Sequence, residues 1–130
     1  MILVDTSVWV EFFRGKSDPI VKLLSECLDE DQVVLAAPVR LELLSGAPRK
    51  QKPLLDRLLS ALPLFYPDEA TWPQIEEWIE QGLAKGQRFG AMDLLIAAIA
   101  KEYDCALWSL DRDFHRMASL GWIKLYSTGE

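Results

Sequence analysis

The sequence predicts an α/β fold, a three-layer α/β/α domain with a central parallel sheet. Short apolar runs alternate along the chain with longer segments whose apolar residues recur every three or four positions, as when strands alternate with helices. The strand-like runs are apolar throughout, which is typical of parallel strands buried on both faces. The 130 residues suffice for one hydrophobic core, so we expect a single domain over residues 1–130 with right-handed crossovers.

The chain opens with an apolar run over residues 1–4, a predicted strand that Asp5 ends. Residues 7–13 then read as a short helix. Asp18-Pro19 is a helix-start signal, with Asp18 as N-cap and Pro19 at the first helical position, and apolar residues recur at helical spacing after it.

The rest of the chain continues this alternation. Apolar residues three or four positions apart indicate the helices, as at Trp72, Ile75, Ile79 and Leu83, and short unbroken apolar runs indicate the strands. The expected elements are a strand at 33–37, a helix at 38–46, a helix at 54–62, a strand at 64–66, a helix at 69–85, a helix at 91–103, a strand at 105–109, a helix at 113–118 and a last strand at 122–126.

Composition and charge exclude several classes of protein. Hydrophobic residues make up 50% and charged residues 26%, which is the balance of a soluble globular protein and not of a disordered one. The net charge of −6 argues against a histone-like binder of bulk polyanions. No apolar run reaches the roughly 18–20 residues of a membrane span. Because the N-terminus also lacks the features of a signal peptide, we expect a cytoplasmic protein without membrane contacts.

The few cysteine and histidine residues restrict the metal chemistry. Cys27 and Cys105 are far apart in sequence and read as core thiols, which argues against a disulfide scaffold or a cysteine-rich zinc site. His115 is the single histidine, so a histidine-based metal site is not expected, and we interpret this residue as structural.

A carboxylate and two hydroxyls follow the first predicted strand, at Asp5-Thr6-Ser7. Open parallel sheets bind their ligands at the carboxyl ends of the strands. Neither a G-x-G-x-x-G motif nor a P-loop is present, so a dinucleotide or nucleoside triphosphate site of the usual kind is not expected. The alternative reading is that Asp5 or Thr6 only caps the helix that begins near Ser7.

Asp93 is the one charged residue in an apolar run from Ala91 to Ala100. Its helical neighbours include Ile96 and Ala97, so we expect this face to lie against protein. A carboxylate in that position is costly unless it is paired or binds a metal. The alternative is an acid that only complements the dipole at the start of its helix.

Further acids are predicted near the same edge of the sheet. Asp111 and Asp113 follow the strand at 105–109, and Glu42 lies one turn into the helix after the second strand. Each has a plain structural reading as well. Asp111 or Asp113 would serve as an N-cap, and Glu42 would lie on the solvated edge of an amphipathic helix.

Asp5, Glu42, Asp93 and Asp111 together are expected to ring one end of the sheet. Convergent carboxylates repel one another unless a cation is present, and oxygen ligands without His or Cys select a hard ion, Mg²⁺ or Mn²⁺. The chemistry that suits such a site is hydrolysis of a phosphodiester by metal-activated water. With four of the 20 acids placed in this site, 16 acids stand against 14 basic residues, so the net charge no longer argues against RNA.

Four segments resemble, in order and spacing, the motifs of the PIN-domain ribonucleases, and the chain looks most like the VapC toxins of type II toxin–antitoxin systems. The first is Val-Asp-Thr-Ser-Val-Trp at residues 4–9, and the second is the Glu42 segment at 38–46. The third is Asp-Leu-Leu-Ile-Ala-Ala at 93–98, and the fourth is Ser-Leu-Asp-Arg-Asp-Phe at 109–114. The resemblance spans nearly the whole chain.

The resemblance implies a metal-dependent endoribonuclease that a cognate antitoxin holds inactive and that forms a homodimer. The residues that the motifs assign to the site are the acidic quartet Asp5, Glu42, Asp93 and Asp111, the alternative or supporting ligand Asp113, and the supporting hydroxyls of Thr6 and Ser109. The fourth motif has Ser109 where Thr is common, and members of the family vary in which acid of this motif contacts the metal, so the choice between Asp111 and Asp113 stays open. The number of metal ions, one or two, is also open.

Basic and aromatic residues are candidates for contacts with partners. Arg88 and Arg112 lie in loops that should border the crevice, and binding of RNA phosphates needs such cations. The resemblance suggests that the early helices form a groove for an antitoxin. Trp9 and Phe13 are the candidates for side chains exposed there, although most of the tryptophans are expected to pack in the core.

Two other functions fit the same residues. One is a PIN-domain nuclease that processes RNA or cuts DNA flaps and has no toxin role. The other is an inert PIN-fold interaction module. The intact acidic set argues against the inert module, because such a protein would have no reason to hold Asp93 in an apolar helix.

Overall fold

The computed structural model describes residues 1–128 and contains a four-stranded parallel sheet in the order β3-β2-β1-β4. The strands are β1 (Ile2–Val4), β2 (Val33–Ala36), β3 (Leu64–Phe65) and β4 (Ala106–Trp108). In the centre of the sheet, Ile2 pairs with Val33 on one side and with Ala106 on the other. The α/β fold with a central parallel sheet is therefore confirmed.

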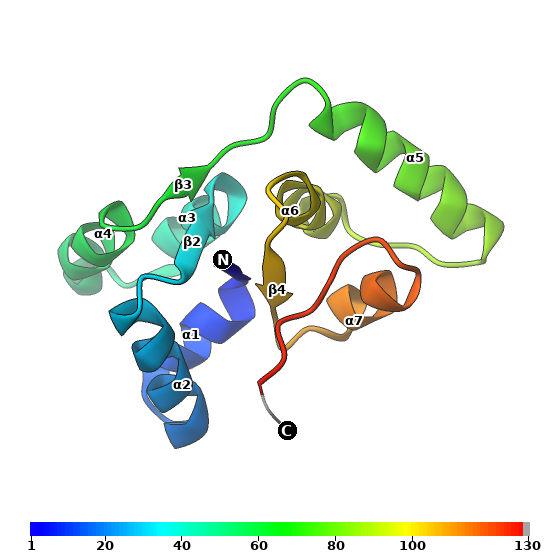
Figure 1. The fold of residues 1–130 in the computed structure, drawn as a ribbon. Helices are drawn as coiled ribbons and strands as arrows, with labels where there is room; N and C mark the ends of the chain where they lie inside the picture. The colour runs from blue at the N-terminus through cyan, green and yellow to red at the C-terminus, as the bar shows by residue number, and fades with distance from the viewer. Residues whose placement is uncertain (129–130) are drawn as a thin grey trace.

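Helices cover both faces of this sheet. They are α1 (Thr6–Arg14), α2 (Asp18–Asp29), α3 (Ala37–Gly46), α4 (Lys52–Ser60), α5 (Thr71–Ala84), α6 (Ala91–Glu102) and α7 (Arg112–Ser119), with a 3₁₀ turn, η1 (Arg49–Gln51), before α4. In Figure 1, α1, α2 and α4 lie on the left of the view and α5 and α7 on the right, with the N-terminus and β4 between them. This arrangement is the three-layer α/β/α domain that the sequence predicts.

The core explains why the strand-like runs are apolar throughout. Every residue of β1 and β2 is buried, and so are half of the residues of the central helix α6. Alanines at positions 97, 98 and 100 let α6 pack closely on its neighbours, with no exposure to solvent. Complete burial of a Leu or Val side chain contributes about 1.5–3 kcal/mol to folding, so the sheet and α6 form a stable base for the loops at the sheet edge.

The strand predicted at residues 122–126 does not form. Only one bridge joins the segment to β4, between Leu107 and Leu125, supported by backbone bonds from Leu107 to Lys124 and from Tyr126 to Leu107. Trp122 instead stacks on Trp78 of α5, with ring centroids 5.1 Å apart. This packing holds the start of the segment away from the sheet and leaves it only a short contact with β4.

The predicted cap of the second helix is also wrong. Ser17, in an extended conformation, is the N-cap of α2, and Asp18 is the first helical residue. Asp18 therefore lies inside the first turn, where an acid still complements the helix dipole. Among the described residues, no helix is long and apolar enough to cross a bilayer.

Candidate metal centre

The strands β1 and β4 are parallel neighbours, so the residues that follow them meet at one edge of the sheet. Asp5 follows β1 directly and is buried, with 5% of its surface exposed. It caps α1 through a bond that its Oδ2 accepts from the backbone N–H of Ser7. The capping role expected as an alternative for Asp5 is therefore present, and it leaves the second carboxylate oxygen free for another role.

Two hydroxyls hold the Asp5 carboxylate. Ser7 Oγ donates to Asp5 Oδ2 at 2.8 Å, and Ser109 Oγ donates to the same oxygen at 2.7 Å. Ser109 Oγ also accepts the backbone N–H of Asp111 at 2.9 Å. The expected support from Ser109 thus has a geometric basis, whereas Ser7 was not predicted as a supporting residue. Its only signal in the sequence is its place directly after Asp5-Thr6.

Thr6 supports a different acid, Glu42 of α3. Thr6 Oγ1 donates to Glu42 Oε1 at 2.8 Å, which joins α1 to α3. Glu42 is partly buried, so it does not lie on the freely solvated edge of its helix. The hydroxyl and the carboxylate fix one another at the same edge of the sheet.

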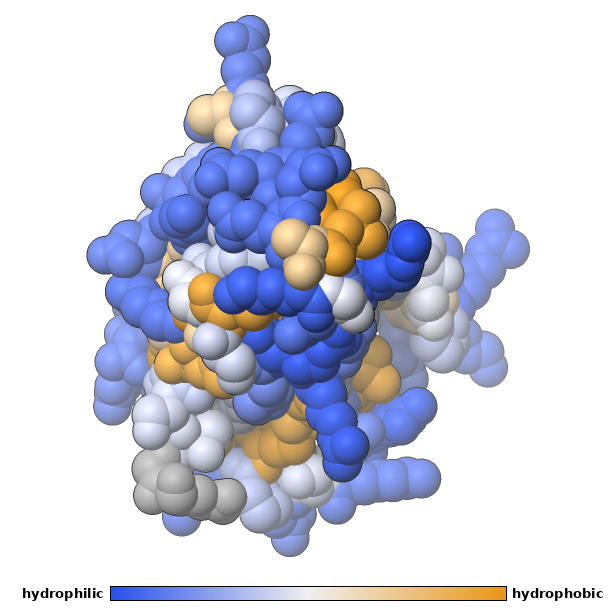
Figure 2. All heavy atoms as spheres, turned by 90° about the vertical axis from the view of Figure 1, so that its right-hand side faces the viewer, coloured by the Kyte–Doolittle hydropathy of each residue, from blue (hydrophilic) through white to orange (hydrophobic). Residues whose placement is uncertain are grey.

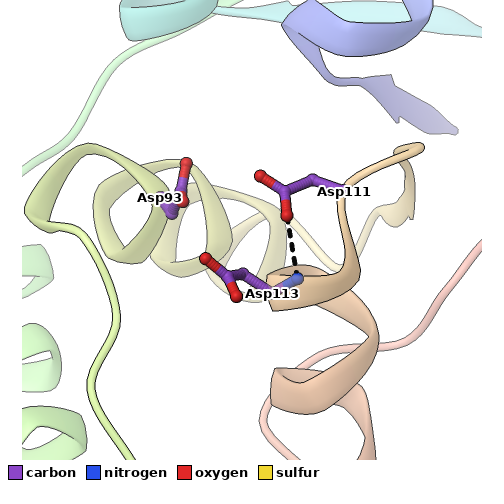
Figure 3. Close-up of side chains that lie close together, drawn as sticks. All are labelled: Asp93, Asp111 and Asp113. Atoms are coloured by element: carbon purple, nitrogen blue, oxygen red, sulfur yellow. Dashed lines mark hydrogen bonds between the residues drawn. The ribbon is translucent and has the colours of Figure 1, made fainter.

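Three aspartates form the tightest group. Asp93, Asp111 and Asp113 each offer one carboxylate oxygen, and these oxygens lie within 4.8 Å of one another. Figure 3 shows the three side chains reaching toward one another from α6, from the loop after β4 and from the first turn of α7. Asp111 is the N-cap of α7, and its Oδ1 accepts the N–H of Asp113 at 2.9 Å.

The five acids act on one another electrostatically. Burial, followed in order of effect by the negative charges of Asp111, Asp5, Asp113 and Glu42, together raise the pKa of Asp93 from 3.8 to about 6. All the acids predicted for the site are therefore close enough to disfavour ionisation of Asp93. A group that resists ionisation in this way gains most from a bound cation.

The hydrogen bonds around the acids leave one oxygen of each available. Among the described residues, Asp5, Glu42, Asp111 and Asp113 each accept side-chain or backbone hydrogen bonds on a single carboxylate oxygen, and Asp93 accepts none. The four carboxylates that accept hydrogen bonds are thus oriented through one oxygen, and their second oxygen is available to a ligand. Such a donor set, made of oxygens alone, fits a hard cation such as Mg²⁺ or Mn²⁺.

Arg116 of α7 is a neighbour of this centre that is not among the residues assigned to the site from the sequence. Its Nη1 donates to Asp113 Oδ1 at 2.8 Å, and its Nη2 donates to Gln87 Oε1 at 3.4 Å. Its guanidinium also lies over the ring of Phe89, 4.4 Å from the centroid. Arg116 therefore joins α7 to the loop that leads into α6. An arginine on the polar face of a short helix carries no sequence signal that would separate it from a solvated one.

The basic and aromatic residues predicted for partner contacts differ in their exposure to solvent. Arg88 and Arg112 are both exposed, and among residues 1–128 neither forms an ion pair. Trp9 is completely buried, so the expectation that it is exposed is wrong; it stacks on Phe13 and packs edge-on against Phe12. Phe13 is 40% exposed, as expected.

The sequence of this chain matches a known protein family over most of its length. The family model described as PIN domain matches residues 2–120. The chain belongs to the PIN-domain family. This PIN domain is 32% identical over 127 residues to VapC ribonuclease Mb1587 of Mycobacterium bovis, a match that covers 92% of the chain and 93% of that relative. Ribonuclease VapC11 of Mycobacterium tuberculosis matches with the same identity and coverage.

Solved structures agree with this assignment at the level of the fold. The PIN domain superposes on a chain of VapBC-1 from nontypeable Haemophilus influenzae with a TM-score of 0.79 and 20% identity, over 100% of both chains. A chain of VapBC2 from Rickettsia felis, solved bound to a DNA fragment from their promoter, gives a TM-score of 0.78 and 22% identity, over 97% of this chain and 98% of that one.

Proposed function

We propose that this PIN domain is a divalent-metal-dependent endoribonuclease, a VapC-type toxin that a partner antitoxin holds inactive. The observation that supports this most directly is the group of Asp93, Asp111 and Asp113, whose oxygens lie within 4.8 Å of one another at the carboxyl edge of the sheet. Carboxylates so close together are costly without a cation. The substrate class follows from the relatives, which are named ribonucleases.

In this proposal the carboxylates bind the metal, and the hydroxyls form hydrogen bonds to the carboxylates. Asp93, Asp111 and Asp113 are the nearest ligands, with Asp5 and Glu42 beside them. When bound, a divalent cation lowers the pKa of water and neutralises charge on the attacking and leaving oxygens of a phosphodiester. The protein's own part is to keep the carboxylates in place, which lowers the cost of reorganisation during the reaction.

Substrate binding is assigned to the two exposed arginines. Arg112 follows Asp111 directly, and Arg88 lies in the loop before α6, so both are near the proposed centre in the chain. Because no described acid pairs with either guanidinium, both are available for phosphate oxygens of RNA. Attack of water on an RNA phosphodiester bound at the acids would then cleave the RNA into two fragments without a covalent enzyme intermediate.

Cleavage of mixed RNA by the full chain tests the proposal. We expect cleavage in Mg²⁺ or Mn²⁺, loss of cleavage in EDTA, and loss in Asp5→Asn and Asp93→Asn. Asp104→Asn is the matched control, because Asp104 is an exposed carboxylate just beyond the opposite end of α6. Cleavage that persists in EDTA would refute the metal dependence, and cleavage that persists in both site variants would refute the site.

The antitoxin is proposed as a small protein that covers part of this chain. The structural neighbours from Rickettsia felis and Haemophilus influenzae are named as VapBC assemblies. Here Phe13, Leu41 and Leu54 are exposed on α1, α3 and α4, which pack in series, and exposed apolar side chains suit a protein partner. Expression of the chain alone should arrest growth, and coexpression with the product of the adjacent gene should relieve the arrest and block cleavage.

The same experiment separates the toxin from a processing nuclease. RNA cleavage without growth arrest, and without inhibition by the neighbouring gene product, would favour the processing role. A homodimer is also part of this proposal, and light scattering of the purified chain at several concentrations measures it.

A further inference from the structure

A cavity of about 300 Å³ lies between the end of β4 and the segment after α7. It adjoins the proposed metal centre through shared residues. Ser109 lines the cavity and also donates to Asp5, while Leu110 lines it and lies between Ser109 and Asp111 in the chain. A ligand in this cavity would therefore lie one residue's distance along the chain from the acids at the end of β4.

The lining of the cavity suits an uncharged, flat ligand. Among the described residues that form its wall, there is no carboxylate, ammonium or guanidinium group. Trp108 and Tyr126 lie in the wall with their ring centroids 5.3 Å apart, and the Leu110 side chain is 47% exposed. Binding of a phosphate needs a cation, whereas pockets rich in apolar and aromatic groups with a few polar atoms bind small organic rings.

His115 supplies one of the polar groups of the wall. Its Nδ1 lies 3.1 Å from the carbonyl oxygen of Asp111. A carbonyl oxygen only accepts hydrogen bonds, so Nδ1 is the nitrogen that donates, and Nε2 of the neutral ring is then an acceptor. Amino and imino N–H groups on the edges of nucleobases are suitable donors to such an acceptor.

We propose that this cavity binds one unpaired nucleobase next to the phosphodiester that is cleaved, with His115 and Leu110 as specificity-determining residues. The inference rests on the proposed ribonuclease function and deepens it. Proteins that read RNA by sequence take unstacked bases out of the strand, pack them on aromatic or apolar groups and bond their edges. The cavity offers both kinds of contact at the border of the acidic group.

The first test measures which base the enzyme prefers at the cut. Wild type, His115→Ala and Leu110→Ala are allowed to cut a random-sequence RNA in Mg²⁺ to low conversion, and the cut sites are sequenced. We expect a base preference at one position beside the cut in wild type and a flattened preference in both variants. The KM for a preferred oligonucleotide should rise roughly three- to tenfold with little change in kcat, as for loss of one hydrogen bond or apolar contact.

Leu83→Ala serves as the matched control, because Leu83 is an exposed leucine on α5 and does not line the cavity. His115→Gln tests whether another hydrogen-bonding group restores part of the preference. If both alanine variants keep the wild-type base preference and KM, the proposal that the cavity binds a nucleobase is refuted, while the ribonuclease function stands.

A second measurement does not depend on cleavage. The four nucleoside 5′-monophosphates are titrated into the Asp93→Asn protein while NMR signals of Leu110, His115 and Trp108 are followed. We expect saturable shifts for at least one nucleotide, and no shifts for it once His115 is changed to Ala. Absence of shifts for all four nucleotides would refute nucleobase binding in the cavity even if wild type cleaves RNA. Saturable shifts in a protein that cleaves no RNA would support the cavity and refute the proposed function.

Discussion

Ser109 Oγ donates a 2.7 Å hydrogen bond to Oδ2 of Asp5, joining residues that are 104 positions apart in the chain. Asp5 follows β1 and Ser109 follows β4, and these strands pair in parallel, so the bond fixes the two ends of adjacent strands to one another. The position of the Asp5 carboxylate therefore depends on β4 as much as on its own helix.

Replacement of Ser109 by Ala should destabilise the protein and loosen Asp5. The change removes one of the two hydroxyl donors to a buried carboxylate, and a hydrogen bond to a charged group contributes about 1.5–3 kcal/mol. Urea unfolding in EDTA measures the loss, and Ser60→Ala on the exposed end of α4 is the control. Ser109→Thr keeps the hydroxyl and should keep more of the stability. Equal stability of Ser109→Ala and wild type would show that the bond contributes nothing.

The raised pKa of Asp93 predicts how stability depends on pH in the absence of metal. The folded protein holds the Asp93 proton up to about pH 6, whereas the unfolded chain releases it near 3.8. Between these values the folded state binds more protons than the unfolded state, so the free energy of unfolding should fall as pH rises from about 4 to about 6. Above that window this contribution should not change further.

Asp93→Asn tests this dependence without the ionisable group. In EDTA at pH 8 the variant should unfold at higher denaturant concentration than wild type, and the difference should shrink toward pH 4. Asp104→Asn is the contrasting control, because the hydrogen bond and charge of Lys124 lower the pKa of Asp104. If the difference in free energy of unfolding between wild type and Asp93→Asn is the same at pH 4 and at pH 8, the prediction is contradicted. Added Mg²⁺ should reverse the order of the two proteins at pH 8, since a bound cation favours the charged form.

The gathering of the acids could be predicted from sequence because each one has a local reason to be near the edge. Asp5 and Asp111 follow buried strands, and parallel strands end at the same edge of a sheet. Asp93 is conspicuous because an acid in an apolar helix needs a partner. What sequence could not rank was Asp113 against Asp111, since both occupy the same helix start and only the side-chain geometry places both beside Asp93.

Other features depend on contacts that have no local signal. The segment at 122–126 has the apolar pattern of a strand, but Trp122 stacks on Trp78 of α5 and meets Phe89 of the loop before α6 edge to face, contacts that the apolar pattern does not reveal. Trp9 looks available for a partner on a short amphipathic helix, yet it is completely buried. Arg116 and Ser7 act on the acids only through side-chain contacts across loops and helix starts.

Gly82 is predicted to be essential for the loop that precedes α6. A Cβ at this buried position of α5 would lie 2.8 Å from the backbone oxygen of Gln87, and the N–H of Gln87 donates to Gly82 O at 2.8 Å. Gly82→Ala must therefore shift the loop, at a cost of about 1–3 kcal/mol. Gly46→Ala is the matched control, since a Cβ at the end of α3 meets nothing within 4 Å. Chemical denaturation of both variants measures the difference, and equal stability would contradict the close approach.

Arg116→Ala should destabilise the loop at residues 86–90 more than its own helix. Arg116 and Asp113 are 41% and 37% exposed, so solvent screens their ion pair and the pair itself contributes under about 1 kcal/mol. The larger loss is the contact with Gln87 and Phe89, which Lys cannot reproduce because it lacks the planar fork.

Hydrogen exchange measures this local effect. Amide exchange of residues 86–90 should speed up in Arg116→Ala and in Arg116→Lys. The control is Arg14→Ala, which breaks an exposed pair of the same spacing with Glu11 on α1. Unchanged exchange in the loop would show that Arg116 does not join the two elements.

Arg88 and Arg112 should contribute to RNA affinity and not to folding. Both are exposed and, within the part of the chain that the structure describes, form no ion pair, so their removal should leave the free energy of unfolding within about 0.5 kcal/mol of wild type. If each binds one phosphate of single-stranded RNA, each Ala variant should lower the slope of log affinity against log salt by roughly 0.7. Fluorescence anisotropy in the Asp93→Asn background measures the slope without cleavage. Arg57→Ala, an exposed arginine on α4, should keep the full slope, and equal slopes in all three variants would refute the assigned phosphate contacts.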